Sequence, residues 1–450
     1  MSKPVTVIIS DLHLGGGPTD PGDDHVYQGD QLVKLLRAEL GTSDHGMRGE
    51  IEILINGDLF ELAQVRPDLY AGRDCLTWSS EAESLQRLNV ILEGHAGIFA
   101  AMKEFQELRN IVTMAAGNHD VDLYWPEVQK RIREVAGPVQ FELGNIWYSR
   151  HDGRLQISHG HMEDPANKFK NWEDPIVRPA HEAARLEMCP GTVFMLKLVN
   201  VLEKDYPFVD NIKPVTALAR LLWRESKTGL LGVAWLLTKF MAKHPDAALG
   251  PKISDPSEFH KKLKRFVQID TDMQQRVREV AEAVYGKPQA SDNLAKLLAT
   301  EQTLFDFMMD VLRARGLDGL KKLELSAGGA LSAGGATGTL AIQRAGRMDE
   351  KEHLRIVAKN RFLADGKCEV VVMGHTHQPD EWKIGEKWYY NPGSWTRYAD
   401  ISKQDALTLE KLKDESKFPY QLNYVRVEEV GDGLLISEMK AFESDPGKPF

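Results

Sequence analysis

The sequence predicts an α/β fold, in which strands and helices alternate along the chain and pack in layers. Five short runs of apolar and β-branched residues have the length of buried strands, and they lie at 5–10, 51–56, 110–116, 155–158 and 369–373. Segments with the three-to-four spacing of amphipathic helices lie between the first four runs, at 28–40, 80–108 and 125–136. A cluster containing Asp, Asn or His follows each run, and α/β folds bind ligands beyond the carboxyl ends of their strands.

Two glycine-containing turns predict β-hairpins. Asp-Gly at 152–153 joins two strand-like runs, and Gly-Asp-Gly at 431–433 does the same near the C-terminus. The strands of a hairpin run antiparallel, so the sheet is expected to finish with antiparallel strands.

A long helical segment interrupts this pattern. Residues 166–365 are predicted to form a mostly helical insertion or cap, with helices at about 177–205, 214–244, 257–286, 290–315 and 350–362. The Gly/Ala-rich tract at 326–338 has no preceding strand, so it reads as a flexible loop and not as a phosphate-binding loop. The chain then divides into an α/β domain, residues 1–165 plus 366–450, and the inserted cap.

Composition narrows the functional class. The formal net charge is −10, which disfavours a protein that grips nucleic-acid backbones. The N-terminus reads as a first strand without a signal peptide, and the three cysteines show no metal or disulfide spacing. The longest apolar run, 229–237, is about half the ~20 residues of a membrane span. We therefore expect a cytoplasmic protein without a transmembrane segment.

The five polar clusters predict a metal site. They read DLH, GDLFE, GNHD, HGH and GHTH, in chain order. Each cluster alone could be a turn or a helix cap, but five of them at strand ends point to one site. Two cations held close together can clamp a phosphoryl group and generate a hydroxide. Mixed carboxylate, amide and imidazole ligands suit Mn²⁺, with Fe or Zn²⁺ as alternatives, better than Mg²⁺ or Ca²⁺.

In this order the clusters resemble those of the calcineurin-like metallophosphoesterases, over residues 1–165 and 366–440. The resemblance implies a four-layer α/β/β/α sandwich, interrupted here by the helical cap, with a centre of two divalent metals. It assigns Asp11, His13 and His377 to one metal. It assigns Asn118, His159 and His375 to the other, with Asp58 bridging the two.

The same resemblance implies the catalytic roles of a metal-dependent phosphoesterase. A hydroxide between the metals would attack phosphorus, with His119 as the proton donor and Asp120 as its orienting partner. Glu61 is expected beside the ligands, and His161 in the wall of the site.

The substrate is expected to be a phosphodiester or pyrophosphate. The motifs SDLHL, GDLFE and GHTHQP look most like those of the UDP-2,3-diacylglucosamine pyrophosphohydrolase clade. That clade usually has Arg where this chain has His119, and its insertion is far shorter. A phosphomonoesterase or a nuclease of the same fold is an alternative, and so is a non-catalytic scaffold or membrane-surface protein.

The predicted cap carries a local excess of positive charge. Residues 204–265 contain twelve Lys and Arg against six Asp and Glu, interleaved with Trp and Leu. One interpretation is a buried helical hairpin with solvated basic faces. The other is a cap that grips an anionic, partly apolar substrate, such as a lipid–nucleotide, or contacts an anionic membrane peripherally.

Overall fold

The structure is a computed structural model. It describes residues 5–19, 29–39, 51–70, 78–164, 167–178, 180–181, 183–189, 191–192, 195–196, 212–213, 350–400, 408–431 and 433–446. One compact unit comprises Met1–Leu196, Asp349–Ala399 and Glu415–Pro449, and it contains every predicted site residue. The helices predicted at 214–244, 257–286 and 290–315, and the Gly/Ala-rich tract, lie outside the described residues.

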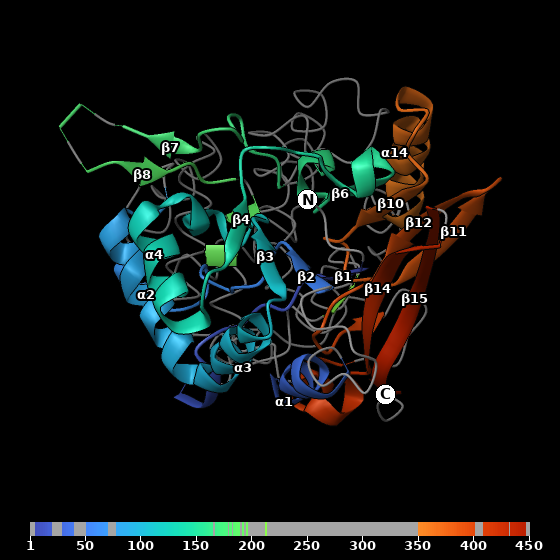
Figure 1. Ribbon diagram of the computed structural model, residues 1–450. Helices are drawn as coiled ribbons and strands as arrows, with labels where there is room; N and C mark the ends of the chain where they lie inside the picture. Colours follow the sequence, from blue (N-terminus) through green and yellow to red (C-terminus); the bar gives the residue numbers. More distant parts are fainter. Residues whose placement is uncertain are drawn as a thin grey trace, which may run out of the picture. The chain divides into compact units, whose positions relative to one another are not determined.

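The first sheet of this unit has six strands in the order β15–β14–β1–β2–β3–β4 (Figure 1). Its central strands β1, β2, β3 and β4 pair in parallel, and their bounds are Val5–Ile9, Ile51–Asn56, Ile111–Ala115 and Gln140–Glu142. The hairpin of β14 (Tyr420–Val430) and β15 (Leu434–Asp445) is joined antiparallel to β1. The prediction that the sheet ends with antiparallel strands is confirmed.

The second sheet has five strands in the order β11–β12–β10–β6–β5. Strand β10 (Val370–Met373) pairs in parallel with β6 (Leu155–Ser158) and with β12 (Lys387–Asn391). The edge strands β5 (Tyr148–Arg150) and β11 (Asp380–Ile384) are antiparallel to their neighbours. The Asp-Gly hairpin at 152–153 is therefore confirmed as the β5–β6 connection.

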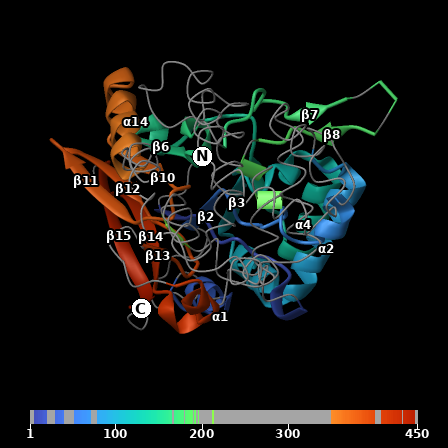
Figure 2. The same cartoon turned by 180° about the vertical axis from the view of Figure 1, so that it is seen from behind.

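Three hydrophobic clusters hold these elements together. Helices pack on one face of the first sheet, namely α1 (Gly29–Lys34), α2 (Glu81–Gly94), α3 (Ala96–Glu107) and α4 (Pro126–Ala136). Helix α14 (Glu350–Ala364) packs on the second sheet, which is also seen from behind in Figure 2. Ile8 and Val425 of the first sheet share a third cluster with Ile157 and Val372 of the second. The predicted α/β class is confirmed.

Short turns and strands complete the described structure. A π-helical turn, η2 (Leu35–Glu39), follows α1. The 3₁₀ turns are η1 (Gly17–Thr19), η3 (Pro67–Tyr70), η4 (Val121–Tyr124), η5 (His151–Gly153), η6 (His161–Glu163), η9 (Leu409–Lys413) and η10 (Glu415–Lys417). Two further short strands are β9 (Ile212–Lys213) and β13 (Ala399–Asp400).

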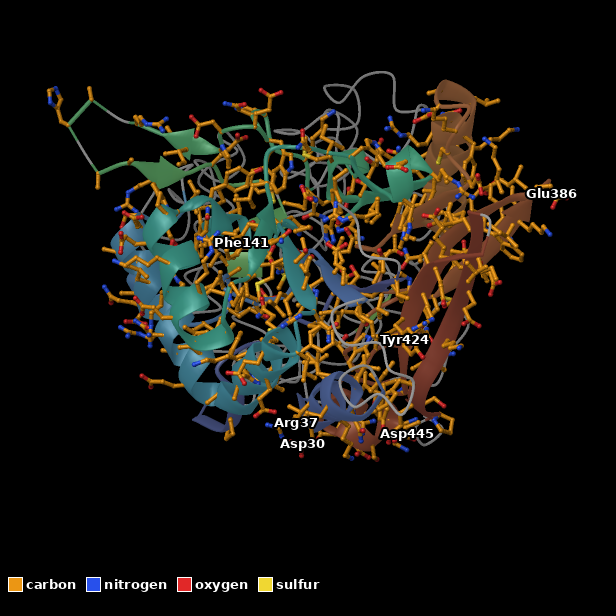
Figure 3. All side chains as sticks on the ribbon, viewed as in Figure 1. Asp30, Arg37, Phe141, Glu386, Tyr424 and Asp445 are labelled. Atoms are coloured by element: carbon orange, nitrogen blue, oxygen red, sulfur yellow. The ribbon has the colours of Figure 1, made fainter. Side chains whose placement is uncertain are left out.

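The outer strand β4 of the first sheet packs against the helices through Phe141. Phe141 packs partly buried against the helical cluster, where its position can be followed in Figure 3. The guanidinium of Arg133 in α4 lies 4.7 Å from the centre of the Phe141 ring. Among the described residues, no helix has the length and apolar character that a membrane span requires.

Two predicted helices differ from the structure. The segment 80–108 forms two helices that meet at His95, where the backbone leaves the helical conformation. A Cβ at Gly94 would meet the backbone of Gly16 at 2.7 Å, so the close approach of the loop after β1 requires glycine here.

The start of the predicted helix at 177–205 is also wrong. Ile176–Val177 and Arg185–Leu186 form the antiparallel strands β7 and β8. The backbone N–H of Trp78 donates to the carbonyl of Leu186 at 2.6 Å, and the Leu186 side chain is buried in the helical cluster. Tertiary pairing therefore overrides local helix propensity at this segment.

Candidate metal centre

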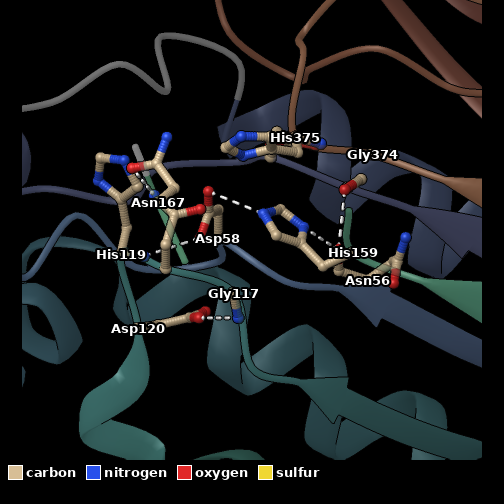
Figure 4. Close-up of polar contacts among 12 residues, drawn as sticks. Asn56, Asp58, Gly117, His119, Asp120, His159, Asn167, Gly374 and His375 are labelled. Atoms are coloured by element: carbon tan, nitrogen blue, oxygen red, sulfur yellow. Dashed lines mark hydrogen bonds and ion pairs between the residues drawn. The ribbon is translucent and has the colours of Figure 1, made fainter. Parts of the chain in front are cut away.

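The predicted ligands lie at the carboxyl ends of five strands. Asp11 and His13 follow β1, Asp58 follows β2, and Asn118 follows β3. The other three come from the second sheet: His159 follows β6, and His375 and His377 follow β10. The side chains from both sheets meet around Asp58, as the close-up in Figure 4 shows for His159 and His375.

The backbone at these strand ends is unusual. Nine described residues other than glycine have a positive φ, and five of them are predicted ligands: Asp11 (55°), His13 (49°), Asp58 (52°), His375 (72°) and His377 (59°). Such a conformation costs of order 1–3 kcal/mol for a residue with a side chain and concentrates at functional sites. The backbone therefore turns sharply just after each of these strands.

Glycines make room for the ligands. A Cβ at Gly117 would overlap the carboxylate of Asp58, and one at Gly57 would overlap the His159 ring. A Cβ at Gly374 would overlap the side chains of Ser10 and Asp11. The strand ends lie so close together that Gly57, Gly117 and Gly374 cannot carry a side chain.

Asp11, His13 and His377 form the first group of side chains that could hold a cation. One potential ligand atom from each lies within 4.8 Å of the others. Nε2 of His13 and Nε2 of His377 are 3.0 Å apart, and Nε2 of His377 is 3.4 Å from Oδ1 of Asp11. This group offers two imidazoles and one carboxylate, a set of ligands that suits a transition-metal cation.

Asp58, His159 and His375 form the second group, and Nε2 of His159 lies 3.1 Å from Oδ2 of Asp58. A third group consists of His13, Asp58 and His119. Asp58 belongs to two of the three groups and lies 4.0 Å from Nε2 of His13. Its carboxylate therefore stands between the two sets of imidazoles.

Buried atoms without hydrogen bonds fit a metal centre. Among the described residues, Oδ1 of Asn118 is buried and has no hydrogen-bond partner, while Oδ1 of Asp11 and Nε2 of His159 are buried and contact only the candidate ligands His377 and Asp58. A buried polar atom left unsatisfied costs about 1–3 kcal/mol. A cation coordinated by these atoms would remove that cost, so the donor set present fits a metal.

In His13 and in His159, the second ring nitrogen, Nδ1, already contacts an oxygen of the protein. Nδ1 of His13 lies 2.7 Å from Oε2 of Glu61, and Nδ1 of His159 lies 2.7 Å from the carbonyl oxygen of Asn56. Metal-binding histidines characteristically give one ring N–H to a carboxylate or a carbonyl and bind through the other nitrogen. Both rings have this arrangement, with Nε2 facing the candidate metal groups.

His119 lies at the open side of the cluster, with 18% of its side chain exposed. Its Nδ1 is 2.8 Å from Oε1 of Glu61, and its backbone N–H donates to Oδ1 of Asp58 at 2.9 Å. Glu61 thus contacts both His13 and His119 and is itself almost fully buried.

Asp120 has different partners from those the sequence predicts. Its two oxygens accept hydrogen bonds from the backbone N–H groups of Gly117, at 2.5 Å, and Leu59, at 2.8 Å. Asp120 therefore joins the loops after β2 and β3. The carboxylate that contacts the His119 ring is Glu61, because the Asp120 oxygens are already engaged with the backbone.

Charge pairing sets the protonation of this part of the site. Burial alone would lower the pKa of His119, but the carboxylates of Glu61 and Asp58 raise it to about 9. Burial alone would raise the pKa of Glu61, but the imidazoles of His119 and His13 lower it to about 2. His119 and Glu61 are therefore a charged pair at neutral pH, next to Asp58.

His161 lies in the wall of the site, behind His159. It is only 3% exposed, and its ring centre is 4.3 Å from that of Trp172 and 5.3 Å from that of His159. Burial and the neighbouring imidazoles of His159 and His375 hold its pKa well below the usual value. His161 is therefore a neutral ring within an aromatic wall.

Three residues at the site escaped the sequence analysis: Asn56, Asp164 and Asn167. Oδ2 of Asp164 lies 3.0 Å from Nε2 of His375, and Asn167 donates to Asp164 and accepts from Asn118. Asp164 and Asn167 lie in HGHMEDPAN, directly after β6, and Asn56 is the last residue of β2, directly before GDLFE. These positions in the sequence were the available signals.

Comparison with known proteins gives a partial match. The family model of the calcineurin-like phosphoesterase superfamily domain matches residues 327–414, which include His375 and His377. A search of the curated proteins finds no match.

Among solved structures, the wild-type Vps29 of Entamoeba histolytica, complexed with Zn²⁺, is 23% identical. The alignment covers 20% of this chain and 47% of that chain, with a TM-score of 0.10. This chain therefore spans about half the length of the structure it matches. The segment that carries the last two candidate ligands is similar to the calcineurin-like phosphoesterase superfamily domain.

Proposed function

We propose that the protein is a phosphoester hydrolase that uses two divalent metal ions. The observation that carries this proposal is the arrangement of the candidate groups. Asp11, His13 and His377 form one group and Asp58, His159 and His375 another, and Asp58 also groups with His13 of the first. The match to the calcineurin-like phosphoesterase domain points to the same chemistry. The proposed scaffold is a four-layer α/β/β/α sandwich, and within residues 166–365 the proposed helical cap is the part between β8 and α14.

In this proposal the ligands divide as the sequence predicts. Asp11, His13 and His377 hold one cation, and Asn118, His159 and His375 hold the other, with Asp58 shared. Two cations bound there would polarise a phosphoryl group and lower the pKa of a water molecule. The mixed nitrogen and oxygen donors favour Mn²⁺, with Fe or Zn²⁺ as alternatives.

His119 is proposed to donate a proton to the leaving oxygen. Its Nδ1 contacts Glu61, which holds the ring and leaves Nε2 to give up a proton. The ring is the more exposed partner of that pair, so a substrate can approach it. Glu61 takes the orienting role that the sequence analysis gave to Asp120.

The substrate class is proposed to be phosphodiesters or pyrophosphates, including a lipid–nucleotide. The basic and aromatic stretch at 204–265 is the proposed binding element for such an anionic, partly apolar molecule, or for an anionic membrane surface. A phosphomonoester preference is the main alternative, because the residues around Asp58 do not themselves select between these esters.

The test is a comparison of two model substrates. Protein purified without chelator is assayed for bound metal and for Mn²⁺-dependent hydrolysis of bis-p-nitrophenyl phosphate and p-nitrophenyl phosphate. We expect two metal ions per chain and diester turnover that falls about 10²–10⁴-fold in His119→Ala. His181→Ala, at an exposed histidine in the same unit, is the matched control and should keep full turnover.

Other results would revise the proposal in defined ways. Turnover of the monoester alone would replace the diesterase with a phosphomonoesterase. Two bound metal ions without turnover of either ester, or turnover that survives His119→Ala, would contradict the proposed mechanism.

A further inference from the structure

We propose that Asp164 and Asn167 form a positioning pair for the second metal. This inference rests on the proposed function, because it concerns the cation assigned to Asn118, His159 and His375. Neither residue belongs to the five clusters that the sequence analysis singled out. Both lie just after η6 and belong to none of the strands of the two sheets.

Asp164 acts on His375. Its Oδ2 lies 3.0 Å from Nε2 of His375, a distance typical of a hydrogen bond between an imidazole and a carboxylate. The contact repeats the pairing of His13 with Glu61 and of His159 with the Asn56 carbonyl. In each case one nitrogen faces an oxygen of the protein and the other remains for a cation. Here the remaining nitrogen of His375 is Nδ1.

Asn167 acts on both Asp164 and Asn118. Its Nδ2 donates to Oδ2 of Asp164 at 2.7 Å, and its Oδ1 accepts from Nδ2 of Asn118 at 3.3 Å. The amide nitrogen of Asn118 is thereby engaged. Its Oδ1 is buried without a hydrogen-bond partner among the described residues, as expected of an oxygen kept for a metal.

One chain of contacts therefore connects two proposed ligands of the same cation. It runs from Asn118 through Asn167 and Asp164 to His375. The contacts join residues far apart in the sequence, so they fix the relative position of the loops after β3 and β10. Asp164 is not a member of any of the three candidate metal groups, which favours a positioning role over direct coordination.

The segment that carries the pair is anchored. The backbone N–H of Asn167 donates to the carbonyl of Asp164 at 2.9 Å. His353 of α14 contacts the carbonyl of Glu163 at 3.2 Å. Phe169 and Trp172 are buried in the helical cluster just beyond. Asp164 is thus held in place although 37% of its side chain is exposed.

The test is a Mn²⁺ titration of metal-free protein by isothermal calorimetry. Loss of a carboxylate or amide that orients a metal ligand typically weakens metal binding about 10–100-fold. In both Asp164→Asn and Asn167→Ala, we expect one of the two dissociation constants to rise by that factor while the other stays unchanged. Asp174→Asn and Asn171→Ala, exposed residues of the same segment, are the matched controls and should leave both constants unchanged.

Metal binding by the wild type separates this inference from the proposed function. Wild-type protein that binds no divalent cation would overturn both. Wild-type protein with two sites, and both constants unchanged in both variants, would overturn the positioning role alone. A lower melting temperature of the metal-free variants with unchanged constants would have the same meaning, because it would show a purely structural role. Asn167→Ala removes no charge, so it keeps the test available if Asp164→Asn folds poorly.

Discussion

The two proposed metal positions, which Asp58 is proposed to bridge, differ in the carboxylates that contact His13 and His375. His13 of the first group contacts Glu61, whose side chain is 1% exposed. His375 of the second group contacts Asp164, whose side chain is 37% exposed. An ion pair or hydrogen bond that water can reach is worth less than a buried one of the same geometry. The first position is therefore expected to hold its cation more tightly than the second.

The largest effect is expected where the two groups meet. Asp58→Asn removes the negative charge proposed to bridge the two cations and leaves a neutral amide among four imidazoles, those of His13, His119, His159 and His375. We expect the variant to lose both cations, and hydrolysis to fall by more than it does in His119→Ala. Metal analysis of the purified variant, with hydrolysis of the diester, measures both.

A variant that keeps two metal ions would contradict the shared role of Asp58. The far-ultraviolet circular dichroism spectrum of the same sample would show whether the fold is intact.

His119→Ala should give the next largest effect and separate chemistry from metal binding. We expect turnover to fall about 10²–10⁴-fold while both cations remain bound, because His119 is proposed to act as the proton donor. The measurement is kcat together with metal content. Loss of one cation in this variant would move His119 into the ligand set that includes His13 and Asp58.

The difference between the supports of the two groups can be tested directly with Glu61→Gln. This change weakens the hydrogen bond between Glu61 and His13. We therefore expect the dissociation constant of the first Mn²⁺ site to rise about 10–100-fold. The constant that rises in Asp164→Asn, that of the second site, should stay unchanged. Calorimetric titration of both variants under the same conditions makes the comparison. If both variants weaken the same site, the two groups do not have separate supports.

Asp120→Asn should have the smallest effect on metal binding. Each oxygen of its carboxylate accepts one backbone N–H, from Gly117 and from Leu59. An amide has a single acceptor oxygen, so the variant loses one of these hydrogen bonds and places its NH₂ against a backbone N–H. We expect the free energy of unfolding to fall by about 1–3 kcal/mol, with both Mn²⁺ constants close to those of the wild type. Denaturant unfolding and metal titration provide the readings. If kcat fell as far in Asp120→Asn as in Glu61→Gln, the result would support Asp120 as an orienting partner of His119.

The sequence located the strand-end residues well because their spacing follows from local structure. Polar residues after an apolar run mark the end of a buried strand, and parallel strands bring such ends together. The contacts of Asp120 and Glu61 were less accessible to this reasoning. Asp120 is the neighbour of His119 in sequence, but the residue that contacts the His119 ring in space is Glu61.

The contacts of Asp164 and Asn167 could not be predicted from spacing. Asp164 meets His375 across more than two hundred residues of chain, and only the pairing of β6 with β10 brings them together. The helix break at His95 has a similar origin, since it depends on the approach of Gly94 to the loop after β1. Both features belong to tertiary packing and leave no periodic pattern in the sequence.

The most direct test of the central claim is electron paramagnetic resonance of the protein loaded with Mn²⁺. Two cations in a two-metal hydrolytic site lie about 3.5–4 Å apart. We expect two Mn²⁺ per chain with a spin-coupled spectrum that disappears in Asp58→Asn. A single bound Mn²⁺, or two with an uncoupled spectrum, would contradict it.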